Sequence, residues 1–158
     1  MREIEFKGKR IDTGEWIEGC YAEFINHLDG DSKPGIQIVE TVPNNFNRMT
    51  PVFKTELIEV DLATVGQYTG RKDSDDAEIY DGTIIAFDFV GFDGDFYNER
   101  RIGLVRYSNE FCAFVISDNL VDDFFGSDLI YFGDAFRASG EVEVLGNRWD
   151  NPELLETK

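Results

Sequence analysis

The stretch TVGQYTGRKDSDDAEIYDGTII, residues 64–85, decides the fold class of this chain. Val65 and Gln67 near its start and the apolar run 79–85 at its end have the composition of two β-strands. The polar connection between them carries the turn-forming residues Gly70, Asp73, Ser74, Asp75 and Asp76. Turn residues between two apolar segments predict a strand–loop–strand unit.

The composition predicts a folded, acidic protein. The chain has 158 residues, of which 42% are hydrophobic and 14% aromatic, so it can bury a core and is too apolar to be disordered. Its 32 acidic and 15 basic residues give a net charge of -17, which disfavours phosphate backbones and anionic membranes as partners. The chain contains no apolar run of about 18 residues, so no membrane helix is predicted. The first ten residues also lack a signal-peptide pattern. We therefore expect a cytoplasmic protein.

The two cysteines, Cys20 and Cys112, do not form a CxxC pair. In a cytoplasmic protein such cysteines are usually reduced, and free cysteines are often buried as small apolar side chains. We therefore predict two reduced thiols in the core.

Short strands separated by turns continue on both sides of the opening stretch. The expected strands are 4–11, 15–24, 36–39, 52–60, 83–90, 96–107, 111–116, 129–132 and 141–145. Neither face of the strand at 52–60 is cleanly polar, which predicts that both faces are covered. One or two helical turns are expected at 119–125, and Asn151-Pro152 predicts the start of a short C-terminal helix that docks through Leu154 and Leu155.

This pattern predicts a mainly β fold with two parts. Residues 1–62 form an N-terminal β layer built on a hairpin, and residues 63–158 form a small SH3-like β-barrel that ends in the short helix.

Three blocks of the sequence carry a resemblance to a known family. The first is residues 2–19, with GKR and GEW; the second is residues 64–82, with VGQYTG, KD and EIYDG; the third is residues 145–155, with LGN and NPELL. On these blocks the chain resembles the YopX family of phage and prophage proteins. The resemblance implies a mainly β fold, a bacterial cytoplasm and a mobile-element origin, and it implies no reaction.

The chain departs from the family pattern at two places. Thr83 stands where the family tends to carry an acid, and residues 74–77 replace a turn of the Lys-Asn-Gly type. The missing acid argues against carboxylate chemistry centred on Asp81.

No catalytic or metal-binding constellation is visible. His27 is the only histidine, and the chain has no phosphate-binding glycine motif. The acids of the 73–81 loop fail the EF-hand spacing, which leaves open whether that loop binds an ion. We expect a solvated acidic loop, no metal, no cofactor and no enzymatic activity.

Two surface hypotheses compete with an ordinary acidic surface. From Ser108 to Phe136 there is no Lys or Arg, and acids alternate with aromatic residues. If the acids share a face, they form a DNA-mimic surface that inhibits a basic host or phage protein. The residues expected to carry that surface are Asp118, Asp122, Asp123 and Asp128.

The opposite hypothesis is a small-barrel nucleic-acid binder. It uses basic side chains together with exposed aromatic residues such as Tyr68, Tyr97 and Tyr107. The basic side chains are Arg71, Lys72, Arg100, Arg101, Arg106, Arg137 and Arg148.

We expect a non-enzymatic accessory protein that acts by binding an unknown protein partner or by forming a homo-oligomer. Unpaired strand edges in such a fold are one route to self-association. Trp16 and Trp149 lie beside glycines in the family blocks and are assigned to packing.

Overall fold

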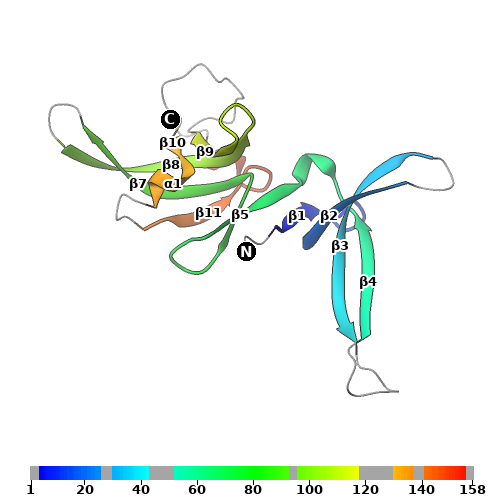
Figure 1. Cartoon of the computed structure of the whole chain (residues 1–158). Helices are drawn as coiled ribbons and strands as arrows, with labels where there is room; N and C mark the ends of the chain where they lie inside the picture. Colours follow the sequence, from blue (N-terminus) through cyan, green and yellow to red (C-terminus); the bar gives the residue numbers. More distant parts are fainter. Residues whose placement is uncertain are drawn as a thin grey trace. The chain divides into compact units, whose positions relative to one another are not determined.

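The computed structural model describes residues 4–25, 30–42, 52–92, 96–117, 130–136 and 141–155. The chain divides into two compact units, Met1–Gln67 and Tyr68–Lys158. In the described part, antiparallel β-strands dominate and the only α-helix is four residues long, which confirms the predicted mainly β fold (Figure 1). Within that part, no helix is long and apolar enough to cross a membrane.

The first unit is an antiparallel sheet with the strand order β4-β3-β2-β1-β5. The predicted N-terminal hairpin is confirmed, because β1 and β2 pair from Lys9 opposite Trp16 to Phe6 opposite Gly19. The elements of this unit are β1 (Phe6–Lys9), β2 (Trp16–Ile25), β3 (Ser32–Val42), β4 (Val52–Glu59), the 3-10 turn η1 (Leu62–Thr64) and the start of β5 (Gly66–Lys72).

Ile36 and Val60 form the fully buried centre of the first unit. Gly8 on β1 lies directly against them, since a β-carbon at that position would be 3.3 Å from Val60 Cβ. The end of β4 also closes onto the end of β1: Ile11 N–H donates to the Glu59 carbonyl at 3.3 Å. The core therefore lies where β1, β3 and the end of β4 meet.

Strand β3 is longer than the four residues expected at 36–39. The segment Lys33-Pro34-Gly35 is strand, although proline and glycine usually mark a loop. Proline has no N–H to donate, but its carbonyl can still accept a hydrogen bond. The Pro34 carbonyl accepts one from Val60 N–H at 3.2 Å, so Pro34 can pair within the sheet.

The second unit contains a five-stranded antiparallel sheet with the order β10-β9-β8-β7-β11. Among the described residues, the end strands β10 and β11 do not pair with each other, so the predicted barrel is an open sheet. From Tyr68 onward β5 pairs antiparallel with β6, which follows β5 in the strand order of the other sheet. The remaining elements are β6 (Glu78–Tyr80), β7 (Thr83–Phe92), β8 (Phe96–Ser108), β9 (Ala113–Ser117), β10 (Ile130–Tyr131), α1 (Phe132–Ala135), β11 (Glu143–Asn147) and the 3-10 turn η2 (Pro152–Leu155).

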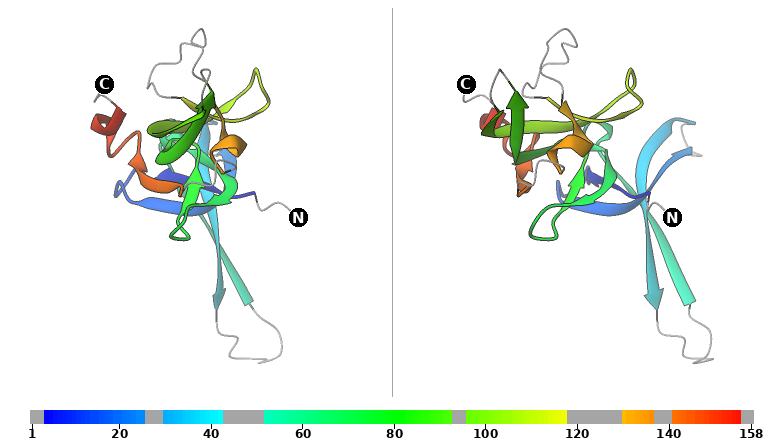
Figure 2. Two further views of the ribbon diagram at one scale, coloured as in Figure 1. Left: turned by 90° about the vertical axis from the view of Figure 1, so that its left-hand side faces the viewer. Right: turned by 60° about the vertical axis from the view of Figure 1, so that its left-hand side comes forward.

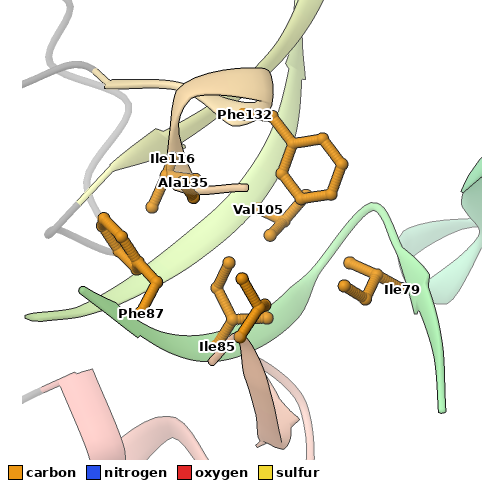
Figure 3. Packing of buried hydrophobic residues seen from close by; sticks show 8 residues of the cluster. Ile79, Ile85, Phe87, Val105, Ile116, Phe132 and Ala135 are labelled. Carbon is orange, nitrogen blue, oxygen red and sulfur yellow. The ribbon is translucent and has the colours of Figure 1, made fainter. Parts of the chain in front are cut away.

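One face of this sheet holds the main hydrophobic core. Figure 3 shows Phe132 from α1 and Ile79 from β6 converging on Val105 and Ile85 of the central strands. The buried cluster consists of Ile79, Ile85, Phe87, Val105, Ile116, Phe132, Ala135 and Val142.

The helix predicted after Asn151 is instead a four-residue 3-10 turn. Leu154 N–H bonds to the Asn151 carbonyl at 3.2 Å, and the Asn151 side chain accepts a bond from Asn147 N–H at 3.4 Å. Leu154 and Leu155 are half-buried, as expected of residues that dock a segment too short to be stable alone.

The turn between β6 and β7 is fixed by the C-terminal block of the sequence. Gly82 has φ +87°, and a β-carbon there would overlap the ring of Trp149. The Gly82 N–H donates to the Val105 carbonyl at 2.8 Å, while its own carbonyl accepts from Arg148 N–H at 2.9 Å. The packing role predicted for Trp149 is confirmed, and the second and third family blocks meet at this contact.

Replacing Gly82 tests this contact. The Gly82→Ala variant should lose about 3 kcal/mol of unfolding free energy, because alanine both disfavours the positive φ and displaces Trp149. Urea unfolding followed by circular dichroism measures the loss. Gly133→Ala is the control, since a β-carbon at Gly133 meets nothing within 4 Å. Equal stabilities for the two variants would contradict the assignment.

Candidate functional site

The far end of the β3–β4 hairpin contains only two strands. Strand β2 pairs with β3 from Ser32 to Gln37, whereas β3 continues with β4 from Gly35 to Val42. Residues 38–42 of β3 therefore pair only with residues 52–56 of β4, and we call this two-stranded segment the ribbon. Figures 1 and 2 show it projecting beyond β1 and β2.

The described side chains of the ribbon are largely in solvent. Val39 is 57% exposed, Ile38 is half-buried, and residues 54–56 are all exposed. The prediction that β4 is covered on both faces is therefore wrong for this segment. A two-stranded hairpin offers no third strand or second layer to cover either face, and such a hairpin is marginally stable alone in water.

The peptide groups of β4 alternate between its two sides. Val60 N–H donates to the carbonyl of Pro34 on β3, and the residues in step with Val60 are Ile58, Glu56 and Lys54. In an antiparallel ladder the intervening residues direct their N–H and C=O groups to the opposite side. Glu59 fits this pattern, since its carbonyl accepts a bond from Ile11 on the outer side.

Thr55 and Leu57 consequently present their N–H and C=O groups along the outer edge of β4. This outer edge, residues 53–57, has no strand beside it within the described residues. Leu57 is 39% exposed, and the Lys54 and Glu56 side chains form a solvent-exposed ion pair at 3.3 Å. The arrangement can add another extended chain by main-chain hydrogen bonds, and its side chains can select which chain binds.

The acidic 73–81 loop is organised differently from an ion site. Asp73 accepts backbone N–H bonds from Asp75 at 2.9 Å, Ala77 at 2.8 Å and Val144 at 2.9 Å. Burial raises the pKa of Asp73, but these three bonds outweigh it and hold the pKa below its ordinary value. Asp73 thus ties the β5–β6 turn to β11, and its oxygens are already occupied. Among the described residues, no three potential ligand side chains gather as a metal site.

Asp81 lies in the β6–β7 turn, immediately before Gly82. Burial raises the pKa of Asp81 above its ordinary value. A 3.2 Å hydrogen bond from Tyr107 N–H and the charges of Arg148 and Arg106 lower it, but burial is the larger effect. The neighbouring Thr83 hydroxyl accepts a bond from Tyr80 N–H at 3.0 Å, so the residue that replaces the family's acid serves the turn itself.

The predicted acidic surface falls outside the part of the chain that is described. Asp118, Asp122, Asp123 and Asp128 all lie in residues 118–129, and His27 lies in residues 26–29, so the hypotheses that use them stay predictions.

Several of the predicted basic residues are engaged with acids or aromatic rings. Arg100 pairs with Asp88 at 3.4 Å and Glu143 at 3.0 Å, and Arg101 pairs with Glu99 at 3.0 Å. Lys72 pairs with Glu78. Arg71 lies over the ring of Phe136, and Arg148 lies over the ring of Trp149. Arg106 is buried, with 7% of its surface exposed. Arg137 is outside the described residues.

Both cysteines are free thiols, but they are exposed, so the predicted core location is wrong. Cys20 lies on β2, and Cys112 lies in the β8–β9 turn with φ 49°. The apolar character of the cysteine side chain does not predict which side of a strand or turn faces solvent.

These features define a mainly β protein whose distinctive described surface is an open strand edge. A family model described as YopX protein matches residues 15–156, which is most of the chain. The chain belongs to the YopX family, as its sequence blocks predicted.

One solved structure has a similar fold over the whole chain. It is protein EF1440 from Enterococcus faecalis, with a TM-score of 0.52 and 18% sequence identity over 98% of this chain and 99% of that one. At this identity the likeness shows the fold alone. A search of curated proteins gives no match.

The Asp73 assignment makes a pH-dependent prediction. Asp73→Asn should cost about 2 kcal/mol at pH 7, because an amide places a donor against one of the three N–H groups. The pKa of Asp73 is lowered by folding, so its contribution is present above about pH 4 and is lost as the pH falls through the folded value. The difference between the two proteins should therefore shrink in acid.

Urea unfolding at a series of pH values measures this difference. The matched control is Asp75→Asn in the same loop, whose exposed side chain should be replaceable without loss. A constant difference across the acid range would contradict the role given to the Asp73 carboxylate.

Proposed function

We propose that this YopX-family chain is a non-enzymatic accessory protein of a phage or prophage that acts in the bacterial cytoplasm by binding another protein chain. The observation that carries the proposal is the outer edge of β4, with Thr55 and Leu57 presenting unpaired peptide groups among the described residues. Strand addition to such an edge is a common mode of protein recognition.

The ribbon has the features that strand addition requires. The outer edge of β4, residues 53–57, carries no proline. It has the exposed ion pair of Lys54 and Glu56 within the ribbon and the exposed Leu57 immediately after it. Proteins that avoid association usually shorten, cover or break such an edge, or place charged side chains on it, so the Lys54–Glu56 pair limits which strands can add. An added strand would give the ribbon a third strand, which stabilises a hairpin that is marginal alone.

The acidic-inhibitor and nucleic-acid hypotheses remain alternatives with different experimental signatures. Binding through Asp118, Asp122, Asp123 and Asp128 would be weakened by salt and indifferent to changes in β4. Nucleic-acid binding would appear as salt-dependent retention on single-stranded DNA.

A proline in the outer edge tests the proposal. Thr55→Pro removes an outward N–H and places a ring there, while the inward bonds of Lys54 and Glu56 to β3 are kept. Protein association, measured by analytical ultracentrifugation of the purified chain and by capture from host lysate, should fall about tenfold or more. Thr55→Val is the matched control because it retains the N–H and should bind like the wild type.

The unfolding midpoint of Thr55→Pro must stay close to that of Thr55→Val, which shows that the ribbon is intact. Association that survives in the proline variant would contradict the proposal. Loss of binding with salt in both variants alike would favour the acidic surface instead.

A further inference from the structure

We propose that the outer edge of β4 pairs with the same edge of a second copy of this chain, antiparallel and about a two-fold axis through Thr55. The inference rests on the proposed function and specifies its partner. Such a contact is isologous, because each copy offers the same surface to the other.

The backbone permits this pairing. Thr55 and Leu57 both direct their peptide groups outward, as the alternation from Val60 shows. With the axis on Thr55, each Thr55 faces the other, and Leu57 faces position 53 of the second copy. Positions 53, 55 and 57 all direct their N–H and C=O groups to the outer side of β4. The outward groups of the two copies can therefore form one continuous hydrogen-bond ladder.

The charges select this register. An axis on Thr55 places Lys54 opposite Glu56 of the partner subunit, and Glu56 opposite Lys54 of the partner subunit. The two side chains already lie on one face of β4, since they form an ion pair at 3.3 Å. Pairing would join four side chains in an alternating group of two positive and two negative charges, and opposite charges directly across strands are favourable.

Neighbouring registers lack this complementarity. An axis on Lys54 puts that lysine opposite itself, and an axis on Glu56 puts that glutamate opposite itself; like charges directly opposed are destabilising. The edge of β3 offers no such complementarity, because Glu40 is the only charged residue in 38–42 and no register can place an opposite charge across from it. The outer edge of β4 is thus self-complementary where the β3 edge is not.

Charge reversal tests the register. Lys54→Glu gives four negative charges at the contact, and Glu56→Lys gives four positive charges. Each single variant should lose self-association about tenfold or more. An equimolar mixture of the two variants should recover it, since every cross-strand pair is again opposite. The double variant Lys54→Glu/Glu56→Lys should also self-associate.

Analytical ultracentrifugation up to several hundred micromolar, at about 0.15 M salt to screen the net charge of each copy, measures these states. Arg101→Glu and Glu99→Lys are matched controls, because they reverse an ion pair two residues apart on β8 and change the net charge equally. Both controls should self-associate like the wild type.

The outcomes separate this inference from the proposed function. A wild-type chain that stays monomeric, or a mixture that fails to recover association, overturns the two-copy contact. Capture of another protein that Thr55→Pro abolishes would still support the interaction function in that case. Loss of both self-association and Thr55-dependent capture would overturn the two together.

Discussion

The hydrogen-bonding requirement of strand β4 is the constraint on which this account depends. A strand needs partners for its peptide groups on both sides, and β4 has a strand on one side only along residues 53–57 of the described chain. Water can satisfy those groups, but it adds no burial and no third strand. Another extended chain can form hydrogen bonds with those peptide groups. It would also bury the exposed leucine and pair with the Lys54–Glu56 charges at the same edge.

The second unit meets the same physical requirement internally. Its central strands are buried by α1 and β6 on one face, and its turns are held by side chains from distant sequence. Asp73 reaches Val144, and Gly82 receives the ring of Trp149. Through these contacts the middle and C-terminal family blocks, which are far apart in sequence, stabilise one another. Gly82 and the Asp73 carboxylate are therefore structural.

Much of the fold could be predicted from local sequence, because strands and turns leave local signals. The N-terminal hairpin and the long strands of the second unit follow from alternation and from turn residues. The start of β3 was not predicted because Pro34 usually indicates a loop. Its place in the strand depends on a hydrogen bond from Val60 N–H, which no local sequence pattern reveals. The open sheet, the exposed cysteines and the 3-10 turn at Pro152 likewise depend on tertiary contacts. The candidate edge could not be predicted for the same reason: an unpaired side is defined by which strands lie elsewhere.

Residue-resolved amide hydrogen exchange at increasing protein concentration tests the central claim most directly. The amides of Thr55 and Leu57 point outward, whereas those of Lys54 and Glu56 are bonded to β3. Exchange at Thr55 and Leu57 should be fast in dilute solution and slow down as the protein concentration rises, while Lys54 and Glu56 should be protected throughout. Fast exchange at Thr55 and Leu57 at every concentration would contradict the paired edge.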